Sequence, residues 1–169
     1  MKAQSEILVF ILLFLLSIVL FTITVYWSRD AFQQNVDITR VSSAERFMKE
    51  MNYDIKSLMK YGGHKEIDYN VDGPIKLVDN HTIEVKTVVT SDISLPTSWN
   101  NISSDYSYIS EILDGDVFRI QLVFPEDDYS VEFFTDGPTL AKPKRVVIEE
   151  NSTDIENGKA TIKIRITFV

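Results

Sequence analysis

The feature of the sequence that most constrains the fold is an apolar run of 21 residues from Ile7 to Trp27. The run is interrupted by three hydroxyl-bearing residues, Ser17, Thr22 and Thr24. At about 1.5 Å per residue, a helix of this length spans roughly 30 Å, which is the hydrocarbon thickness of a bilayer. The run therefore predicts one transmembrane helix over residues 7–27, preceded by a short leader over residues 1–6.

The charges that flank this helix indicate its orientation. The amino terminus and Lys2 precede the helix, whereas Arg29 after it is balanced by Asp30, and basic residues favour the cytoplasmic side. We therefore expect a single-pass protein of the cell membrane, with a cytoplasmic N-terminus and an extracytoplasmic C-terminal domain. Three candidate N-glycosylation sequons fall in that domain, at Asn80, Asn101 and Asn151.

The composition limits the classes of function. The chain has no cysteine and a net charge of −8, and residues 1–63 hold seven basic and six acidic residues, so the acidic excess lies in residues 64–169. An acidic domain disfavours nucleic acid as a partner. No nucleotide-binding loop, nucleophile elbow or zinc-binding helix occurs. We expect a non-enzymatic protein with no cofactor, no catalytic residues and no metal site.

The residues directly before the apolar run form a recognisable pattern, Lys2-Ala3-Gln4-Ser5-Glu6. This pattern resembles the processing site of archaeal class III signal peptides, which occur on type IV pilin-like proteins. The resemblance implies cleavage between Ala3 and Gln4, with the apolar helix kept in the mature protein. In the family, Ser and Glu occupy the third and fifth mature positions, whereas Ser5 and Glu6 would here be second and third.

The chain from residue 28 to residue 62 predicts an extension of the same helix. Apolar residues recur there at helical spacing and form one stripe, which consists of Val41, Ala44, Phe47, Met48, Met51, Ile55, Leu58 and Met59. We expect this stripe to pack on the protein's own sheet. Gly62 and Gly63 supply a helix end, while a capping box at Ser42 offers the alternative of a second helix. A helix of this kind also resembles the long first helix of type IV pilins.

After Gly63 the apolar period changes from 3.6 to 2, which indicates strands. The expected strands are 66–71, 75–78, 82–90, 117–124, 129–134, 145–149 and 160–169. The last two are expected to pair as a hairpin across residues 151–158. The fold class predicted is therefore α+β, with a long N-terminal helix followed by a small antiparallel β-sandwich-like domain over residues 63–169.

A long Ser- and Asn-rich insert, Ser91 to Leu113, separates two of these strands. Its three aromatic residues, Trp99, Tyr106 and Tyr108, are candidate contact residues. The alternative is that their rings cover the edge of the core. Ile109, Ile112 and Leu113 predict a short helix packed on the sheet.

Two hypotheses of function follow from these features. The first is a type IV pilin-like subunit or accessory component of an archaeal surface filament, whose partners are the lipid bilayer and other pilin-like subunits. The second is an anchored β-domain that binds an envelope component or ligand through the aromatic insert.

Overall fold

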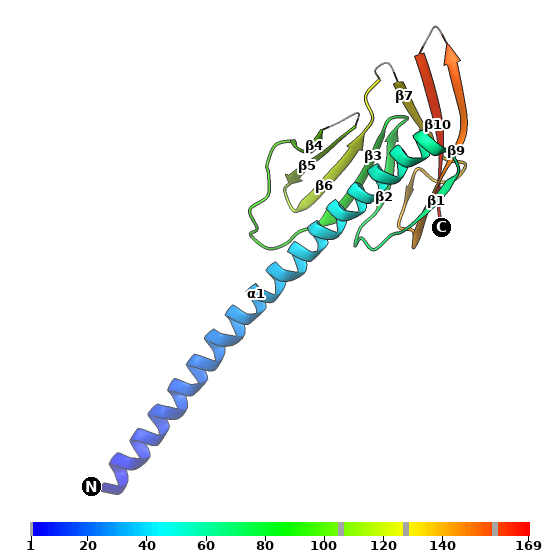
Figure 1. Ribbon diagram of the computed structural model, residues 1–169. Coiled ribbons are helices and arrows are strands. Elements are labelled where there is room, and N and C mark those ends of the chain that lie inside the picture. The colour runs from blue at the N-terminus through cyan, green and yellow to red at the C-terminus, as the bar shows by residue number, and fades with distance from the viewer. Residues whose placement is uncertain (1, 105–106, 127–128, 157–158) are drawn as a thin grey trace. The chain divides into compact units, whose positions relative to one another are not determined.

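The structure is a computed structural model that describes residues 2–104, 107–126, 129–156 and 159–169 (Figure 1). It begins with one helix, α1 (Lys2–Tyr61). Gly62 ends the helix in a left-handed conformation, with φ of 67°, and its N–H donates to the carbonyl oxygen of Leu58 at 2.7 Å. The prediction of one continuous helix that ends at the glycine pair is confirmed.

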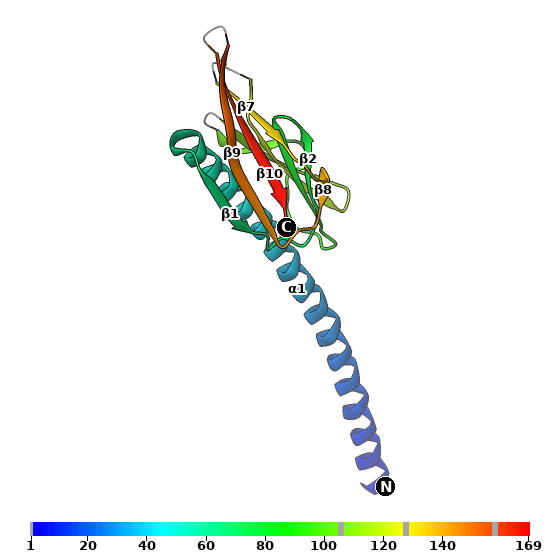
Figure 2. The same cartoon turned by 90° about the vertical axis from the view of Figure 1, so that its right-hand side faces the viewer.

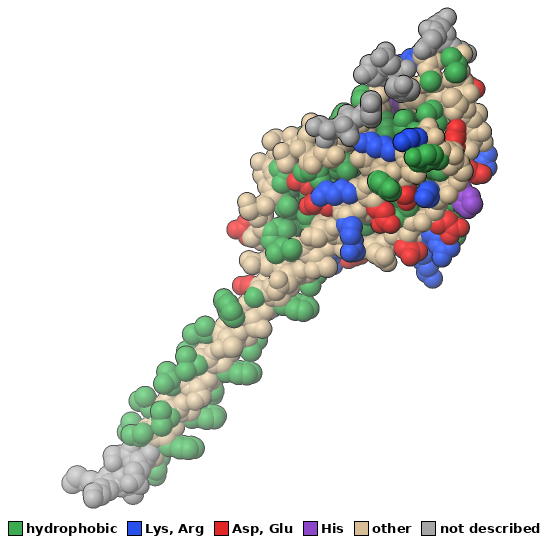
Figure 3. Space-filling view, viewed as in Figure 1, with side chains coloured by type: hydrophobic (Ala, Val, Ile, Leu, Met, Phe, Trp, Pro, Cys, Tyr) green, Lys and Arg blue, Asp and Glu red, His purple; other side chains and the backbone are tan. Residues whose placement is uncertain are grey.

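The chain divides into two compact units, Met1–Val36 and Asp37–Val169. In the first unit the large apolar side chains from Ile7 to Trp27 are exposed, and Figure 3 shows them along this part of α1. An 18-residue stretch reaches a mean hydropathy of 3.1. The helix is thus long and apolar enough for a single transmembrane span.

The described residues of the second unit form ten strands. In chain order they are β1 (His64–Asp68), β2 (Ile75–Asp79), β3 (Thr82–Val88), β4 (Asn100–Ser104), β5 (Tyr108–Asp114), β6 (Val117–Val123), β7 (Tyr129–Phe134), β8 (Leu140–Ala141), β9 (Arg145–Glu156) and β10 (Lys159–Phe168). They form a four-stranded sheet in the order β1-β9-β10-β7 and a six-stranded sheet in the order β4-β5-β6-β3-β2-β8. Figure 2 shows β9 between β1 and β10.

Antiparallel pairs dominate both sheets, as the α+β prediction requires. The exception is the parallel pair of β7 with β10, in which Ile162 lies opposite Val131. After β7 the chain passes through β8 in the other sheet before it returns as the β9–β10 hairpin. A strand that reaches its neighbour through such a crossover can run parallel to it.

The turn between β2 and β3 covers the edge of β7 that faces away from β10. The N–H of Phe133 donates to the carbonyl oxygen of Asn80 at 2.6 Å, and Nδ1 of His81 lies 2.7 Å from the carbonyl oxygen of Val131. Because these bonds use backbone groups that a free edge strand would leave unpaired, they connect the two sheets at one corner.

Both sheets and the second part of α1 share one hydrophobic core. The predicted helical stripe lies in that core, since its members from Val41 to Leu58 are buried. The ring of Phe47 packs edge-on against the ring of Tyr69, with 4.9 Å between centroids. The interpretation of the stripe as a seam within the protein's own domain is therefore confirmed.

The structure corrects the expected short helix at Ile109, Ile112 and Leu113, which lies in strand β5. Ile109 and Leu113 lie opposite Leu122 and Phe118 of β6, so cross-strand pairing outweighs the helical spacing. Strand β9 is also longer than predicted, and it pairs with β10 as the expected hairpin. Strands β4 and β8 were not predicted.

Candidate functional site

The candidate processing residues, Ala3, Gln4, Ser5 and Glu6, lie at the beginning of α1. Their side chains fall outside the part of the chain that the structure describes. Cleavage between Ala3 and Gln4 therefore stays a prediction from the sequence.

Among the described residues of the insert Ser91 to Leu113, the ring of Trp99 is clearly exposed. Trp99 is 45% exposed and directly precedes β4, and the guanidinium carbon of Arg119 lies 5.7 Å from the centre of its ring. This distance is typical of a cation–π contact. Tyr108 is half-buried and begins β5, whereas Tyr106 lies outside the described residues.

The structure does not bring Trp99 and Tyr108 into one patch. Trp99 contacts Arg119, whereas Tyr108 lies opposite Val123. Arg119 and Val123 are four positions apart in β6, which corresponds to roughly 13 Å along a strand. Trp99 is consequently the better candidate for a contact residue.

A buried carboxylate holds Arg119 in place beneath Trp99. Glu84 is 2% exposed, and its Oε2 accepts hydrogen bonds from Arg119 Nη2 at 2.7 Å and Gln121 Nε2 at 2.8 Å. Lys86 Nζ lies 3.2 Å from Oε1. Burial opposes ionisation of Glu84, but these donors outweigh it and lower the pKa of the carboxyl group.

This polar array on β3 and β6 was missed by the sequence analysis. The sequence signal is that polar residues alternate with apolar ones in both strands. In the structure, Glu84 lies opposite Gln121 and Lys86 lies opposite Arg119. The sequence does not show that these two strands are neighbours, so the four residues could not be grouped. Chemically, the array places Arg119 and Lys86, which are paired with Glu84 and Asp114, beside the exposed ring of Trp99.

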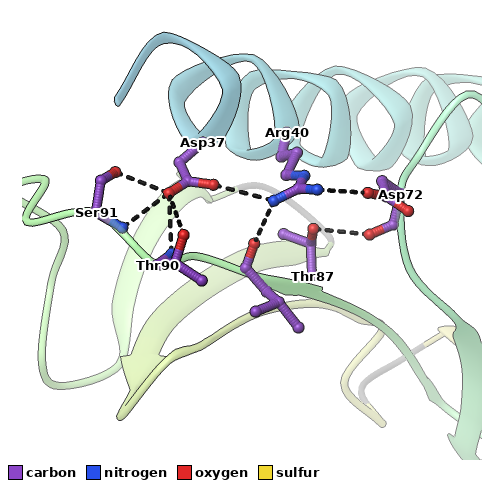
Figure 4. Close-up of polar contacts among 7 residues, drawn as sticks. Asp37, Arg40, Asp72, Thr87, Thr90 and Ser91 are labelled. Carbon is purple, nitrogen blue, oxygen red and sulfur yellow. Dashed lines mark hydrogen bonds and ion pairs between the residues drawn. The ribbon is translucent and has the colours of Figure 1, made fainter. Parts of the chain in front are cut away.

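A second polar cluster ties α1 to the β-domain at the beginning of the second unit (Figure 4). Asp37 is fully buried, and its Oδ2 accepts hydrogen bonds from the N–H of Thr90 at 2.9 Å and from the N–H and hydroxyl of Ser91 at 2.8 Å each. Arg40 Nη1 donates to Oδ1 at 3.1 Å. We call these residues, together with Asp72, the Asp37 cluster.

Arg40 extends the Asp37 cluster to a second loop. Its Nη2 lies 3.0 Å from Asp72 Oδ2, and Lys142 Nζ donates to Asp72 Oδ1 at 2.9 Å. The hydrogen bond and charge of Lys142, followed by the charge of Arg40, lower the pKa of Asp72. The cluster is a structural clamp between α1 and two loops, since each polar group that it uses is bonded within the domain.

The three sequon asparagines, Asn80, Asn101 and Asn151, are all exposed. Asn80 lies in the turn after β2, Asn101 in edge strand β4, and Asn151 in β9, where its Oδ1 accepts a hydrogen bond from Arg165 at 2.9 Å. Asn80 and Asn151 also line one shallow depression of about 330 Å³. Their exposure meets one requirement for attachment of a glycan, and modification stays a prediction.

A second depression of about 360 Å³ lies between α1 and the segment after β3. Its lining is Ile38, Val41, Ser42, Glu45, Ile93, Ser94 and Leu95. In this lining, the carboxylate of Glu45 is engaged with Lys49 Nζ at 3.2 Å. Among the residues that the structure describes, no group of three or more His, Asp or Glu side chains could hold a metal ion.

Comparison of the chain with protein-family models, curated proteins and solved structures gives no match.

Proposed function

We propose that this chain is a non-enzymatic, single-pass membrane protein that displays the domain from Asp37 to Val169 on the outer surface of the cell. The observation that carries the proposal is helix α1, whose apolar side chains from Ile7 to Trp27 are all exposed. These side chains favour a bilayer over water by about 5 to 10 kcal/mol in total.

The polar groups of this segment also suit a lipid environment. The hydroxyls of Ser17, Thr22 and Thr24 donate to the carbonyl oxygens four residues earlier, at 2.8 to 2.9 Å. A hydroxyl that is bonded within its own helix needs no partner from water or from another protein. The three interruptions of the apolar run are therefore no obstacle to insertion.

Within this class, we favour a type IV pilin-like subunit or an accessory component of an archaeal surface filament. Two features support this proposal: the Ala3-Gln4 processing pattern before the helix, and a single helix whose later part belongs to a β-rich domain. When such a subunit leaves the bilayer, its apolar segment must be covered by neighbouring helices. Self-association through residues 7–27 follows from this requirement.

The second candidate is an anchored binding module, and the exposed ring of Trp99 beside Arg119 favours it. In that case residues 7–27 serve only as an anchor. The ligand would be an envelope component that contacts the aromatic and cationic surface over β3 and β6.

The first test is the mass of the intact protein recovered from native membranes. If the leader is processed, the protein begins at Gln4. Replacement of Ala3 by a bulky residue is a matched control that should block the cut. An N-terminus at Met1, in cells with an active prepilin-type peptidase, would overturn the pilin-like proposal.

The second test separates the two candidates by replacing residues 7–27 with an unrelated apolar sequence of equal length. Filament helices must match side chain to side chain, so we expect filament recovery to fail while membrane insertion is kept. Trp99→Ala should instead leave filament recovery unchanged. An unchanged filament yield after the helix replacement would favour the binding module.

A further inference from the structure

Glu111 in the middle of β5 has an unusual environment for a carboxyl group. It lies opposite Ile120 of β6, on the side of the sheet that carries the core, and it is only 7% exposed. Its Oε2 is buried and has no hydrogen-bond partner among the described residues. A buried, unpaired carboxylate oxygen is unfavourable, so this environment suits the neutral acid better than the anion.

The charged groups that face Glu111 come from α1. They are Glu45 and Lys49, and Lys49 Nζ is engaged with Glu45 Oε2 at 3.2 Å. From β4, the side chain of Asn100 hydrogen-bonds the carboxyl group, and β6 contributes only apolar Ile120 opposite it. Burial and then the charge of Glu45 raise the pKa of Glu111, and they outweigh Asn100 and Lys49.

Glu111 also lies next to a weakly held part of the sheet. Strand β4 is an edge strand that pairs only with β5, and its register shifts between Asn101 and Ser103. Edge elements with few partners open locally at a lower free energy than the core. A change at Glu111 therefore acts on the element that can respond most easily.

We propose that Glu111 makes the seating of the β4–β5 hairpin against α1 sensitive to proton concentration. With a neutral Glu111 carboxyl, the hairpin stays closed against Glu45 of α1, and Asn100 of β4 bonds the same carboxyl group. Ionisation places a second negative charge beside Glu45 in a dry contact, and the hairpin loosens. This behaviour does not depend on whether the chain forms filaments.

The direction of the effect follows from proton linkage. The closed state binds the proton of Glu111 more tightly than the open state does. Its advantage is complete at pH values below the pKa of the open state and is lost as the pH rises through the higher pKa of the closed state. Acidification should therefore close the hairpin, which is opposite to the usual acid-induced loosening of a protein.

Hydrogen exchange of the full chain in detergent micelles tests this proposal. Exchange is measured by mass spectrometry at pH 5 and pH 8 and corrected for the chemical exchange rate, with the β9–β10 amides as internal reference. We expect the relative protection of the β4–β5 amides to fall severalfold at pH 8. Glu111→Gln, which mimics the neutral acid, should keep the protection at both pH values.

Two further variants separate the role of Glu111 from a general effect of charge. Glu149→Gln changes an exposed glutamate on β9 and should keep the wild-type pH effect. Glu45→Gln removes the facing charge and frees Lys49, so it should reduce the pH effect even if an amide at position 111 fits poorly. Equal protection of the wild type at both pH values, or an undiminished pH effect in both Glu111→Gln and Glu45→Gln, would overturn the proposal.

Discussion

Asp37 shows how one buried carboxylate can decide the placement of two loops. It is fully buried and accepts hydrogen bonds from the N–H groups of Thr90 and Ser91, which follow the end of β3 at Val88. The carboxylate thus holds the backbone just beyond that strand. The position requires an acceptor with two oxygens, because Oδ2 accepts from Thr90 and Ser91 while Oδ1 accepts from Arg40.

Asp37→Ala should destabilise the domain strongly, since it removes the carboxylate that accepts from two N–H groups and one of the two carboxylates that pair with Arg40. Each buried group left unsatisfied costs about 1 to 3 kcal/mol, so we expect a total loss of at least about 2 kcal/mol. Denaturant unfolding of Asp37→Ala and of the wild type measures this loss of stability. Asp54→Ala on the same helix is the control and should stay within about 0.5 kcal/mol of wild type.

Glu84 gives a prediction of opposite pH dependence to that of Glu111. Its pKa is lowered in the folded state, so its contribution to stability is present above the unfolded pKa of about 4.3 and is lost as the pH falls through the folded value. Glu84→Gln should cost about 1 to 3 kcal/mol at pH 7.

The difference between Glu84→Gln and wild type should begin to shrink as the pH falls below the unfolded pKa, because the ionised carboxyl then loses its advantage in the folded state. Urea unfolding at several pH values provides the measurement. Glu66→Gln, which affects a half-exposed ion pair with Arg145, should change little at any pH. A difference between Glu84→Gln and wild type that stays constant as the pH falls through the unfolded pKa would contradict the assigned role.

At the scale of elements, the second part of α1 is an integral part of the β-domain. Met51 is fully buried in the shared core, whereas Tyr53 on the opposite side of the helix is 73% exposed. Met51→Asp should place a charge in a dry interface and lower the free energy of unfolding by several kcal/mol. Tyr53→Asp is the matched control, and equal melting temperatures of the two variants would show that this interpretation is wrong.

Elements with a clean period could be predicted from the sequence. Strand β10 is the best example, because the alternation of Ile162, Ile164 and Ile166 matches their burial in the core. The helix and its end at Gly62 could be predicted equally well, since both depend on neighbours within a few residues. The fold class followed from these local patterns.

The remaining features depend on contacts between distant parts of the chain. Ile109, Ile112 and Leu113 fit a helix and a strand equally well, and only pairing with β6 decides between them. Asp37 bonds partners that are 53 and 54 positions later in the chain. No local pattern marks such a residue in a helix, so the Asp37 cluster could not be predicted.

At the scale of the whole molecule, the second unit has a core of its own that begins at Val41. We expect a fragment over residues 30–169 to be soluble and to melt cooperatively, because it keeps the core and the Asp37 cluster and omits the apolar run. A fragment over residues 49–169 removes Asp37 and four members of the stripe, and it should not fold. Circular dichroism during heating compares the two, and aggregation of the longer fragment would contradict the prediction.

The place of the last strand in its sheet has a consequence for biosynthesis. Strand β10 is the last of the described strands in chain order, yet it lies inside the four-stranded sheet between β9 and β7, and β1 pairs with β9. A nascent chain that still lacks β9 and β10 can therefore complete neither this sheet nor the core that it covers. We therefore expect the four-stranded sheet to form only after β10 has been synthesised.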